Sequence, residues 1–147
     1  MRRNDRECAL QILYQLDLGG LFAPGEKSAE QLDAAIAHYW GSFDKKKVTV
    51  DKDFSERMVR GIFDHVDSLD ATIQGVARRW RMDRMNAVDR NLLRLAAYEI
   101  LHCPDIPRGV SINEALEIAK KFSGEESRAF INGLLDQLGR GDSGEIK

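Results

Sequence analysis

The chain has 147 residues, of which 43% are hydrophobic and 31% are charged, and its formal net charge is −2. This composition is typical of one globular domain with a core, and it excludes a disordered chain. The slightly negative total also excludes a globally basic protein, so any binding of nucleic acid must depend on local patches of charge.

The cysteines and the N-terminal segment indicate a compartment. Cys8 and Cys103 are the only two cysteines and are far apart, which excludes a disulfide framework and a cysteine-rich zinc site and suits a reducing cytosol. The N-terminal segment has no apolar run of the signal-peptide kind, and no segment approaches the roughly 20 apolar residues of a membrane span. We therefore expect a cytoplasmic protein without a membrane partner.

A first helix is predicted near the N-terminus. Asn4 and Glu7 have the spacing of a capping box, which puts the helix start near Asp5. Gly19 is suited to end this helix. Its apolar face has the helical i, i+3, i+4, i+7 spacing and consists of Ala9, Ile12, Leu13 and Leu16.

Apolar spacing typical of helices continues through the middle of the chain. A second helix is predicted over 28–39, between loops at 21–27 and 44–50. The next apolar stripe covers 53–80. Because Ser68 is suited to cap a new helix at a bend, the pattern predicts two helices in this stretch.

The most hydrophobic stripe of the chain follows a predicted cap formed by Asn86 and Asp89. This stripe consists of Val88, Leu92, Leu95, Ala96 and Ile100. We expect it to mark the central helix of the fold, with its leucines buried.

Two further capping boxes, formed by serine and glutamate, predict the last two helices. The pairs are Ser111 with Glu114 and Ser123 with Glu126. Gly139 is expected to end the last helix, and 140–147 is expected to form a flexible tail. The sequence therefore predicts an all-α fold, a compact bundle of about seven helices with a single domain at 1–139.

The sequence fingerprints of enzymes are absent. There is no GxxxxGK[ST] loop, no GxGxxG loop and no HExxH motif, and the three histidines are isolated. Many carboxylates fall at predicted helix starts, where capping and the helix dipole explain them. We therefore predict no catalytic residue, no metal and no cofactor.

Positive charge is concentrated in three places. The N-terminus carries Arg2, Arg3 and Arg6, which oppose the helix dipole but suit bidentate binding of phosphate. A second cluster surrounds Trp80 and consists of Arg78, Arg79, Arg81, Arg84 and Arg90. An aromatic ring among arginines suits the stacking of a nucleobase, but the apolar spacing favours a core position for Trp80.

The third patch lies at the junction of the last two predicted helices. It consists of Lys120, Lys121 and Arg128, beside Ser127 and Phe130. The free backbone N–H groups at a helix start favour an anion there. Glu125 and Glu126 compete with that role because they place negative charge at the same point.

Five sequence blocks occur in a characteristic order and spacing. They are RECALQILYQLDL, LLRLAAYEI, DIP, SINEALEIAKKFS and FINGLLDQL. The chain resembles the NusB family of bacterial transcription antitermination factors in these blocks, from about Arg6 to Leu138. The same helical fold also serves as the RNA-binding domain of a group of rRNA cytosine methyltransferases, whose large catalytic domain does not fit in 147 residues.

The resemblance implies an all-helical, non-enzymatic adaptor that binds the boxA element of nascent RNA together with the ribosomal protein NusE. It implies that the complex joins the elongating RNA polymerase, notably in rRNA operons. It also implies RNA contacts by Arg2, Arg3, Arg6, Ser127, Arg128 and Phe130. Docking of NusE is implied around Arg79, Arg81, Arg84, Arg90 and Tyr98.

The alternative function is a purely protein–protein helical module that forms a homodimer and does not bind RNA. In that case the arginines only solvate the surface, and a large exposed apolar patch carries the interaction. An enzyme is a third alternative, since catalytic groups can converge in space without a motif.

Overall fold

The structure is a computed structural model that describes residues 2–23, 25, 27–43 and 49–144, with side chains up to residue 138. The described residues form six α-helices and one short 3₁₀ helix, and no strand. In chain order the elements are α1 (Arg3–Leu18), α2 (Ala29–Ser42), α3 (Lys52–Val76), η1 (Met82–Arg84), α4 (Ala87–His102), α5 (Arg108–Phe122) and α6 (Glu125–Gly144). This confirms the all-α prediction. Most of the loop expected at 44–50 lies outside the described residues.

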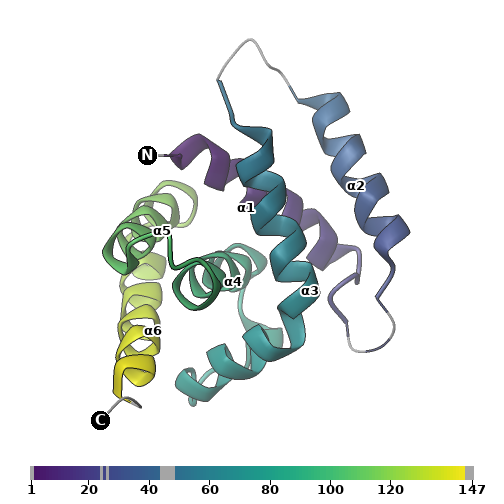
Figure 1. The fold of residues 1–147 in the computed structure, drawn as a ribbon. Coiled ribbons are helices and arrows are strands. Elements are labelled where there is room, and N and C mark those ends of the chain that lie inside the picture. Colours follow the sequence, from purple (N-terminus) through teal and green to yellow (C-terminus); the bar gives the residue numbers. More distant parts are fainter. Residues whose placement is uncertain (1, 24, 26, 44–48, 145–147) are drawn as a thin grey trace.

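Helix α4 is central, as its apolar stripe predicts. It packs against α1, α3, α5 and α6, which surround it in Figure 1, while α2 packs on the outside against α1. Leu92, Leu95 and Ala96 are buried, with at most 1% of their surface exposed. Since burying one leucine contributes about 1.5–3 kcal/mol, this stripe is a major part of the core. Cys8 and Cys103 are also buried.

Helix starts agree with prediction where the cap is purely local. The backbone N–H of Asp89 donates to Oδ1 of Asn86 at 2.8 Å, which confirms the predicted cap of α4. The prediction that Asn4 caps the first helix is wrong, because α1 begins at Arg3 and is preceded by Arg2 in the left-handed conformation. Ion pairs of Arg2 with Asp5 and with the carboxylate of Asp51 hold this earlier start.

Helix α3 is one continuous helix, so the predicted break at Ser68 is wrong. The Ser68 hydroxyl donates to the backbone carbonyl of His65 at 3.1 Å, a bond that a serine inside a helix can make. The buried stripe continues past this point through Leu69 and Ile73, because both contact the core. However, α3 ends at Val76 and does not reach Trp80.

The last two helices also differ from the predicted bounds. Helix α5 begins at Arg108, directly after Pro107. Proline suits a helix start because the N–H that it lacks would have no partner within the helix there. Ser111 therefore lies inside the helix, where it is buried and caps nothing. Helix α6 extends beyond Gly139, since a glycine inside a helix costs only about 1 kcal/mol.

Two absences hold for the described part of the chain. None of its helices has the length and apolar character that crossing a membrane requires. In the same residues, no three side chains of His, Cys, Asp or Glu gather in a way that suits a metal ion.

Candidate nucleic-acid interface

A surface groove of about 610 Å³ lies where the end of α3, η1 and the first turns of α4 and α6 meet. It is lined by arginines, two aromatic rings and several polar side chains: Arg79, Trp80, Arg81, Arg84, Met85, Asn86, Asp89, Glu126, Ser127 and Phe130. The groove brings together two segments that the resemblance assigned to different ligands. Those segments are 79–84, expected to contact a protein, and 127–130, expected to contact RNA.

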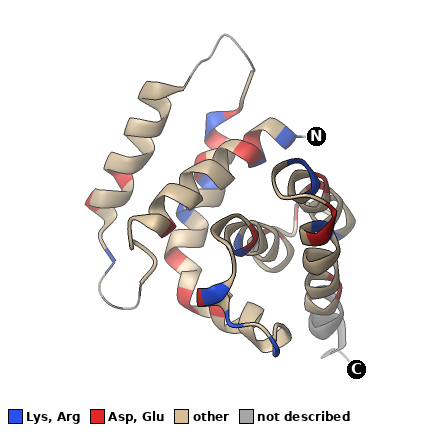
Figure 2. Cartoon of the chain, turned by 180° about the vertical axis from the view of Figure 1, so that it is seen from behind, with Lys and Arg blue, Asp and Glu red and all other residues tan. Residues whose placement is uncertain are grey.

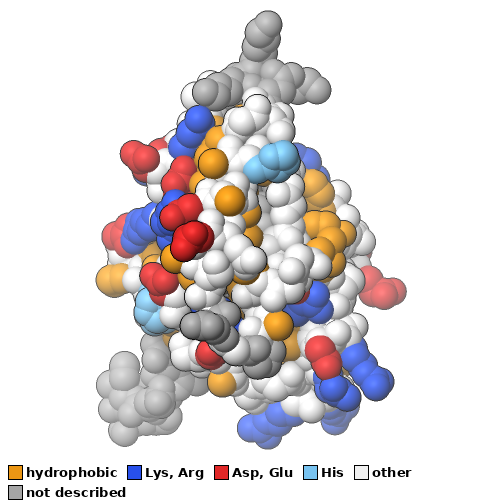
Figure 3. All heavy atoms as spheres, turned by 90° about the vertical axis from the view of Figure 1, so that its right-hand side faces the viewer, with side chains coloured by type: hydrophobic (Ala, Val, Ile, Leu, Met, Phe, Trp, Pro, Cys, Tyr) orange, Lys and Arg blue, Asp and Glu red, His pale blue; other side chains and the backbone are white. Residues whose placement is uncertain are grey.

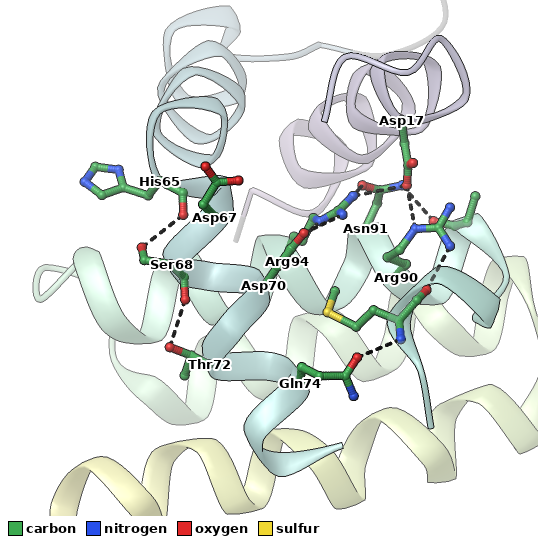
Figure 4. A network of polar contacts seen from close by, with 12 residues as sticks. Asp17, His65, Asp67, Ser68, Asp70, Thr72, Gln74, Arg90, Asn91 and Arg94 are labelled. Carbon is green, nitrogen blue, oxygen red and sulfur yellow. Dashed lines mark hydrogen bonds and ion pairs between the residues drawn. The ribbon is translucent and has the colours of Figure 1, made fainter. Parts of the chain in front are cut away.

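Two side chains hold the backbone of the connection between α3 and α4. Gln74 donates from Nε2 to the carbonyl of Trp80 at 2.7 Å, and its Oε1 accepts from the Met82 N–H at 3.0 Å. Arg90 donates from Nη1 to the carbonyls of Met82 at 3.0 Å and Met85 at 2.8 Å. Figure 4 shows Gln74 and Arg90 on either side of this segment. The groove wall is thus fixed by residues outside the groove.

Arg90 belongs to a buried polar network at the end of α1 (Figure 4). One carboxylate oxygen of Asp17 accepts from Arg90, Asn91 and Arg94 at 2.7, 2.8 and 3.1 Å. Burial opposes ionisation of Asp17, but the hydrogen bonds from Arg90 and Asn91 outweigh it and lower the pKa of this carboxyl. The side chain of Arg90 is thus bonded within the fold, and its expected contact with a partner stays a prediction.

The aromatic rings of the groove are Trp80 and Phe130. Their centroids lie 5.3 Å apart at an angle of 79°, an edge-to-face contact, and Trp80 is 48% exposed. The expected core position of Trp80 is therefore wrong, because α3 ends before it and releases it from the apolar stripe. An exposed indole supported from one side offers a free face on which a nucleobase can stack.

The arginines of the groove supply positive charge. Arg81 pairs with Asp83 at 2.6 Å, whereas the guanidinium groups of Arg79 and Arg84 make no hydrogen bond or ion pair with any residue that the structure describes. Figure 2 shows Lys and Arg along the connection between α3 and α4. In Figure 3 basic side chains gather at the lower end of the molecule, where α3 terminates. Free guanidinium groups at this end suit phosphate oxygens.

Asp89 lines the groove, and its carboxylate accepts hydrogen bonds from neighbouring side chains. Its Oδ2 accepts from the Ser127 hydroxyl and from Nδ2 of Asn86, both at 3.1 Å. Its Oδ1 is buried and has no partner among the described residues. Burial raises the pKa of Asp89. As the pH falls, this carboxyl is therefore protonated sooner than an exposed aspartate would be.

The N-terminal arginines are paired, not free. Arg2 contacts Asp51 at 2.7 Å, and Arg3 forms two hydrogen bonds with Glu114, at 2.8 and 3.0 Å. The hydrogen bond from Arg3 lowers the pKa of Glu114. Arg2 and Arg3 remain partly exposed, at 48% and 36% of their side chains.

Arg6 has a different position from the one expected. Its side chain is 3% exposed and donates to both carboxylate oxygens of Glu99 at 2.8 Å. The same carboxylate accepts from the buried Ser111 hydroxyl at 2.7 Å. The Arg6 guanidinium thus joins α1 to α4 inside the protein, and the expected contact of Arg6 with RNA stays a prediction.

The remaining expected site residues lie apart from the groove. Arg128 follows Ser127 on α6, is half-buried and does not line the groove. Tyr98 lies about 13 Å beyond Asp89 along α4, given the rise of about 1.5 Å per residue. It stacks on His102 at 5.2 Å and covers Gly61, where an added Cβ would lie 2.0 Å from its hydroxyl.

Known proteins place this arrangement in a family. The model of the NusB family matches residues 3–140. The chain belongs to the NusB family. Transcription antitermination protein NusB of Anaeromyxobacter sp. (strain Fw109-5) is 46% identical over 140 residues, which cover 95% of this chain and 90% of that protein. Family membership places the chain among factors that act by binding, and not among enzymes.

Solved NusB structures have the same fold. NusB of T. maritima superposes with a TM-score of 0.75 at 34% identity, over 95% of this chain and 91% of that one. A chain of the crystal structure of antitermination factors NusB and NusE in complex with dsRNA superposes with a TM-score of 0.71 at 22% identity. That match covers 95% of this NusB-family chain and 96% of the other, and it supports the fold alone.

Sequence reasoning missed two structural features of the groove. The free Oδ1 of Asp89 was hidden because the residue also fits a capping box, and the box accounts for only one of its oxygens. The bracing role of Gln74 carries no signal, since an isolated glutamine on a helix is usually solvated. The apolar period itself could have revealed the exposure of Trp80, had the end of α3 been placed at Val76.

Proposed function

We propose that this chain is a transcription antitermination adaptor that binds boxA-type single-stranded RNA together with a NusE-type ribosomal protein. In this role it joins the elongating RNA polymerase and supports transcription of rRNA operons. Membership of the NusB family supports the antitermination role. A protein of the same fold has been solved with NusE and dsRNA, and this makes an RNA and a NusE-type protein the partners to test. In this proposal the helical scaffold holds the arginine side chains and aromatic rings of the groove in place for the RNA.

One observation carries the proposal: the groove combines the exposed ring of Trp80, packed on Phe130, with the guanidinium groups of Arg79 and Arg84, which have no partner among the described residues. Phosphates bind guanidinium groups, while unstacked bases bind to rings and to polar edges. We assign Ser127 and Phe130 to the RNA, with Arg79 and Arg84 as phosphate contacts. Arg2, Arg3 and Arg128 lie outside the groove and extend the RNA surface, whereas Arg81 and Tyr98 remain candidates for contact with the partner protein.

Replacing Arg79 and Arg84 together by alanine is expected to weaken RNA binding and to flatten its salt dependence. Three to five phosphate contacts on single-stranded RNA give log K a slope of about −2 to −3.5 against log salt, at about −0.7 for each contact. The double variant should lose about 1.4 of that slope. Fluorescence anisotropy with a labelled boxA-type RNA at several salt concentrations measures it.

A matched control removes two other arginines. Arg57 and Arg60 are exposed on α3 and pair with Asp105 and Asp33, away from the groove. Their double replacement by alanine changes the net charge equally and should leave the slope unchanged. Equal slopes for both double variants, or no RNA binding by the unmodified chain even with the NusE-type partner, would contradict the proposal.

Replacing Glu126 by glutamine is expected to tighten RNA binding about two- to tenfold at low salt. Glu126 lies in the first turn of α6 and lines the groove, where its negative charge repels a phosphate. Glu30 is the matched control, since it is the acidic residue in the first turn of α2, a helix that does not reach the groove. Anisotropy should show a lower dissociation constant for Glu126→Gln than for the unmodified chain. Glu30→Gln should bind the RNA with unchanged affinity. An effect of equal size in both variants would mean that only net charge matters.

A further inference from the structure

We propose that His65 and His102 form a surface site for one divalent ion of the late first-row transition metals, the class of zinc, nickel and copper. The two histidines are isolated in the sequence, but they lie on α3 and α4, two helices that pack against each other. Their ring centroids are 4.4 Å apart. The site depends on this pair of side chains alone, so it is independent of the groove and of the proposed function.

The spacing of the two rings fits a shared ion. Imidazole nitrogens bind zinc at about 2.0–2.1 Å, so two imidazoles at adjacent positions on one ion have their ring centroids roughly 4.5–5 Å apart. The observed separation is close to this value. The rings can therefore share an ion without a movement of either helix. Imidazole is a ligand that zinc, nickel and copper favour, whereas magnesium and calcium favour oxygen.

Each ring has a nitrogen that is free to bind a metal. The Nδ1 of His65 lies 2.9 Å from the backbone carbonyl oxygen of Gly61. Because a carbonyl can only accept, Nδ1 carries the proton, and Nε2 of the neutral ring keeps its lone pair. Metal-binding histidines are commonly oriented by such a bond. The ring of His102 makes no hydrogen bond or ion pair with any residue that the structure describes. Figure 4 shows the His65 ring outside α3, on the side away from Asp17.

Aromatic packing holds the two imidazoles on rigid helices. The ring of Tyr98 stacks on His102 at 5.2 Å with an angle of 23° between the planes, and it lies 6.1 Å from the ring of His65. The same tyrosine covers Gly61, where α3 and α4 approach so closely that a Cβ would not fit. Sites on packed helices hold their ligands more precisely than sites on loops. The positions of both imidazoles are therefore set by the contact between the two helices.

Local electrostatics favour a cation beside these rings. His102 is in the last turn of α4, and the C-terminal end of a helix carries partial negative charge. Arg57 lies on the same face of α3 as His65, but its charge is neutralised by two hydrogen bonds to Asp105, at 3.1 and 2.8 Å.

The site is open to solvent. Both histidines are exposed, so an ion can reach them from water and can keep water at its remaining positions. The described residues offer no group of three side chains suited to a metal ion. Two imidazoles and water thus make an exchangeable site, unlike the closed four-ligand sites that hold a structural zinc.

Nickel is the probe that tests this site, on the full chain without an affinity tag. Isothermal titration should show one bound ion. The midpoint of thermal unfolding should rise when nickel chloride is added, because an ion that binds only the folded chain stabilises it. Magnesium chloride should have neither effect, since magnesium prefers oxygen ligands. With copper(II) in place of nickel, electron paramagnetic resonance should show coupling to two nitrogens.

Glutamine variants identify the ligands. His65→Gln and His102→Gln should each weaken nickel binding by more than about tenfold, because even the loss of an outer-shell partner costs about ten- to a hundredfold. His38→Gln is the matched control, since His38 is the third histidine of the chain and is exposed on α2. Without added ion, all three variants should unfold at the temperature of the unmodified chain, because substitutions of exposed residues usually change stability little.

Three results would overturn the inference. The first is no nickel binding by the unmodified chain at millimolar ion. The second is binding of unchanged strength in either His65→Gln or His102→Gln, which would place the ion elsewhere. The third is an equal loss of binding in His38→Gln. None of these results bears on RNA binding by the groove, so the proposed function stands or falls separately.

Discussion

Leu95→Asp is expected to leave the chain unfolded. Leu95 is 1% exposed on α4, the helix against which α1, α3, α5 and α6 pack. Deleting a buried leucine side chain costs about 2–5 kcal/mol, and a buried carboxylate without a partner adds several more. The total is comparable to the whole stability of a domain, about 5–15 kcal/mol. Far-UV circular dichroism and urea unfolding measure the outcome.

Leu18→Asp is the control for that substitution. Leu18 ends α1 and is 63% exposed, so the same chemical change occurs in water and should alter stability by at most about 0.5 kcal/mol. A folded Leu95→Asp variant with the cooperative unfolding of the unmodified chain would mean that α4 is not the centre of the core.

Glu99→Ala is expected to destabilise the fold by about 3–5 kcal/mol. Glu99 is 1% exposed and accepts from Arg6 and Ser111, which lie on two other helices. Its removal leaves the guanidinium charge of Arg6 buried without the carboxylate that neutralises it. Urea unfolding should show a lower midpoint with a similar slope, since the fold itself is unchanged.

Apolar replacement of the whole cluster should recover most of this loss. Arg6→Met, Glu99→Leu and Ser111→Ala together remove every buried polar group that Glu99 serves, and such replacements are often neutral or stabilising. The surface pair of Arg81 with Asp83 is the control, because Asp83→Ala should change stability by less than about 1 kcal/mol. If Glu99→Ala has no larger effect than Asp83→Ala, the cluster does not hold α1, α4 and α5 together.

The sequence predicts those elements whose cause is local. The stripe of α4 and the cap at Asn86 follow from spacing and side-chain chemistry alone, and both are confirmed. The start of α1 and the continuity of α3 do not, because contacts with distant residues decide them. Asp51, which pairs with Arg2, lies 49 residues away in the sequence. No local sequence pattern predicts this contact.

The site could be predicted in part for the same reason. Charge and aromatic content identified 79–84 and 127–130, but their meeting in one groove depends on how α6 packs beside α4. The burial of Arg6 was out of reach, since its partner Glu99 lies 93 residues away. An arginine near a chain end is usually solvated, and only the packed fold distinguishes Arg6 from Arg2.

The brace formed by Gln74 has a consequence for protein design. The segment that displays Trp80 owes its shape to an amide on the preceding helix, through bonds to backbone atoms that any sequence would possess. The identity of the displayed side chains is thus separable from the shape of the loop. A transplant of this segment into another helical scaffold should therefore include the glutamine and keep the buried Ala77, and the exposed residues at 78–81 can then be varied.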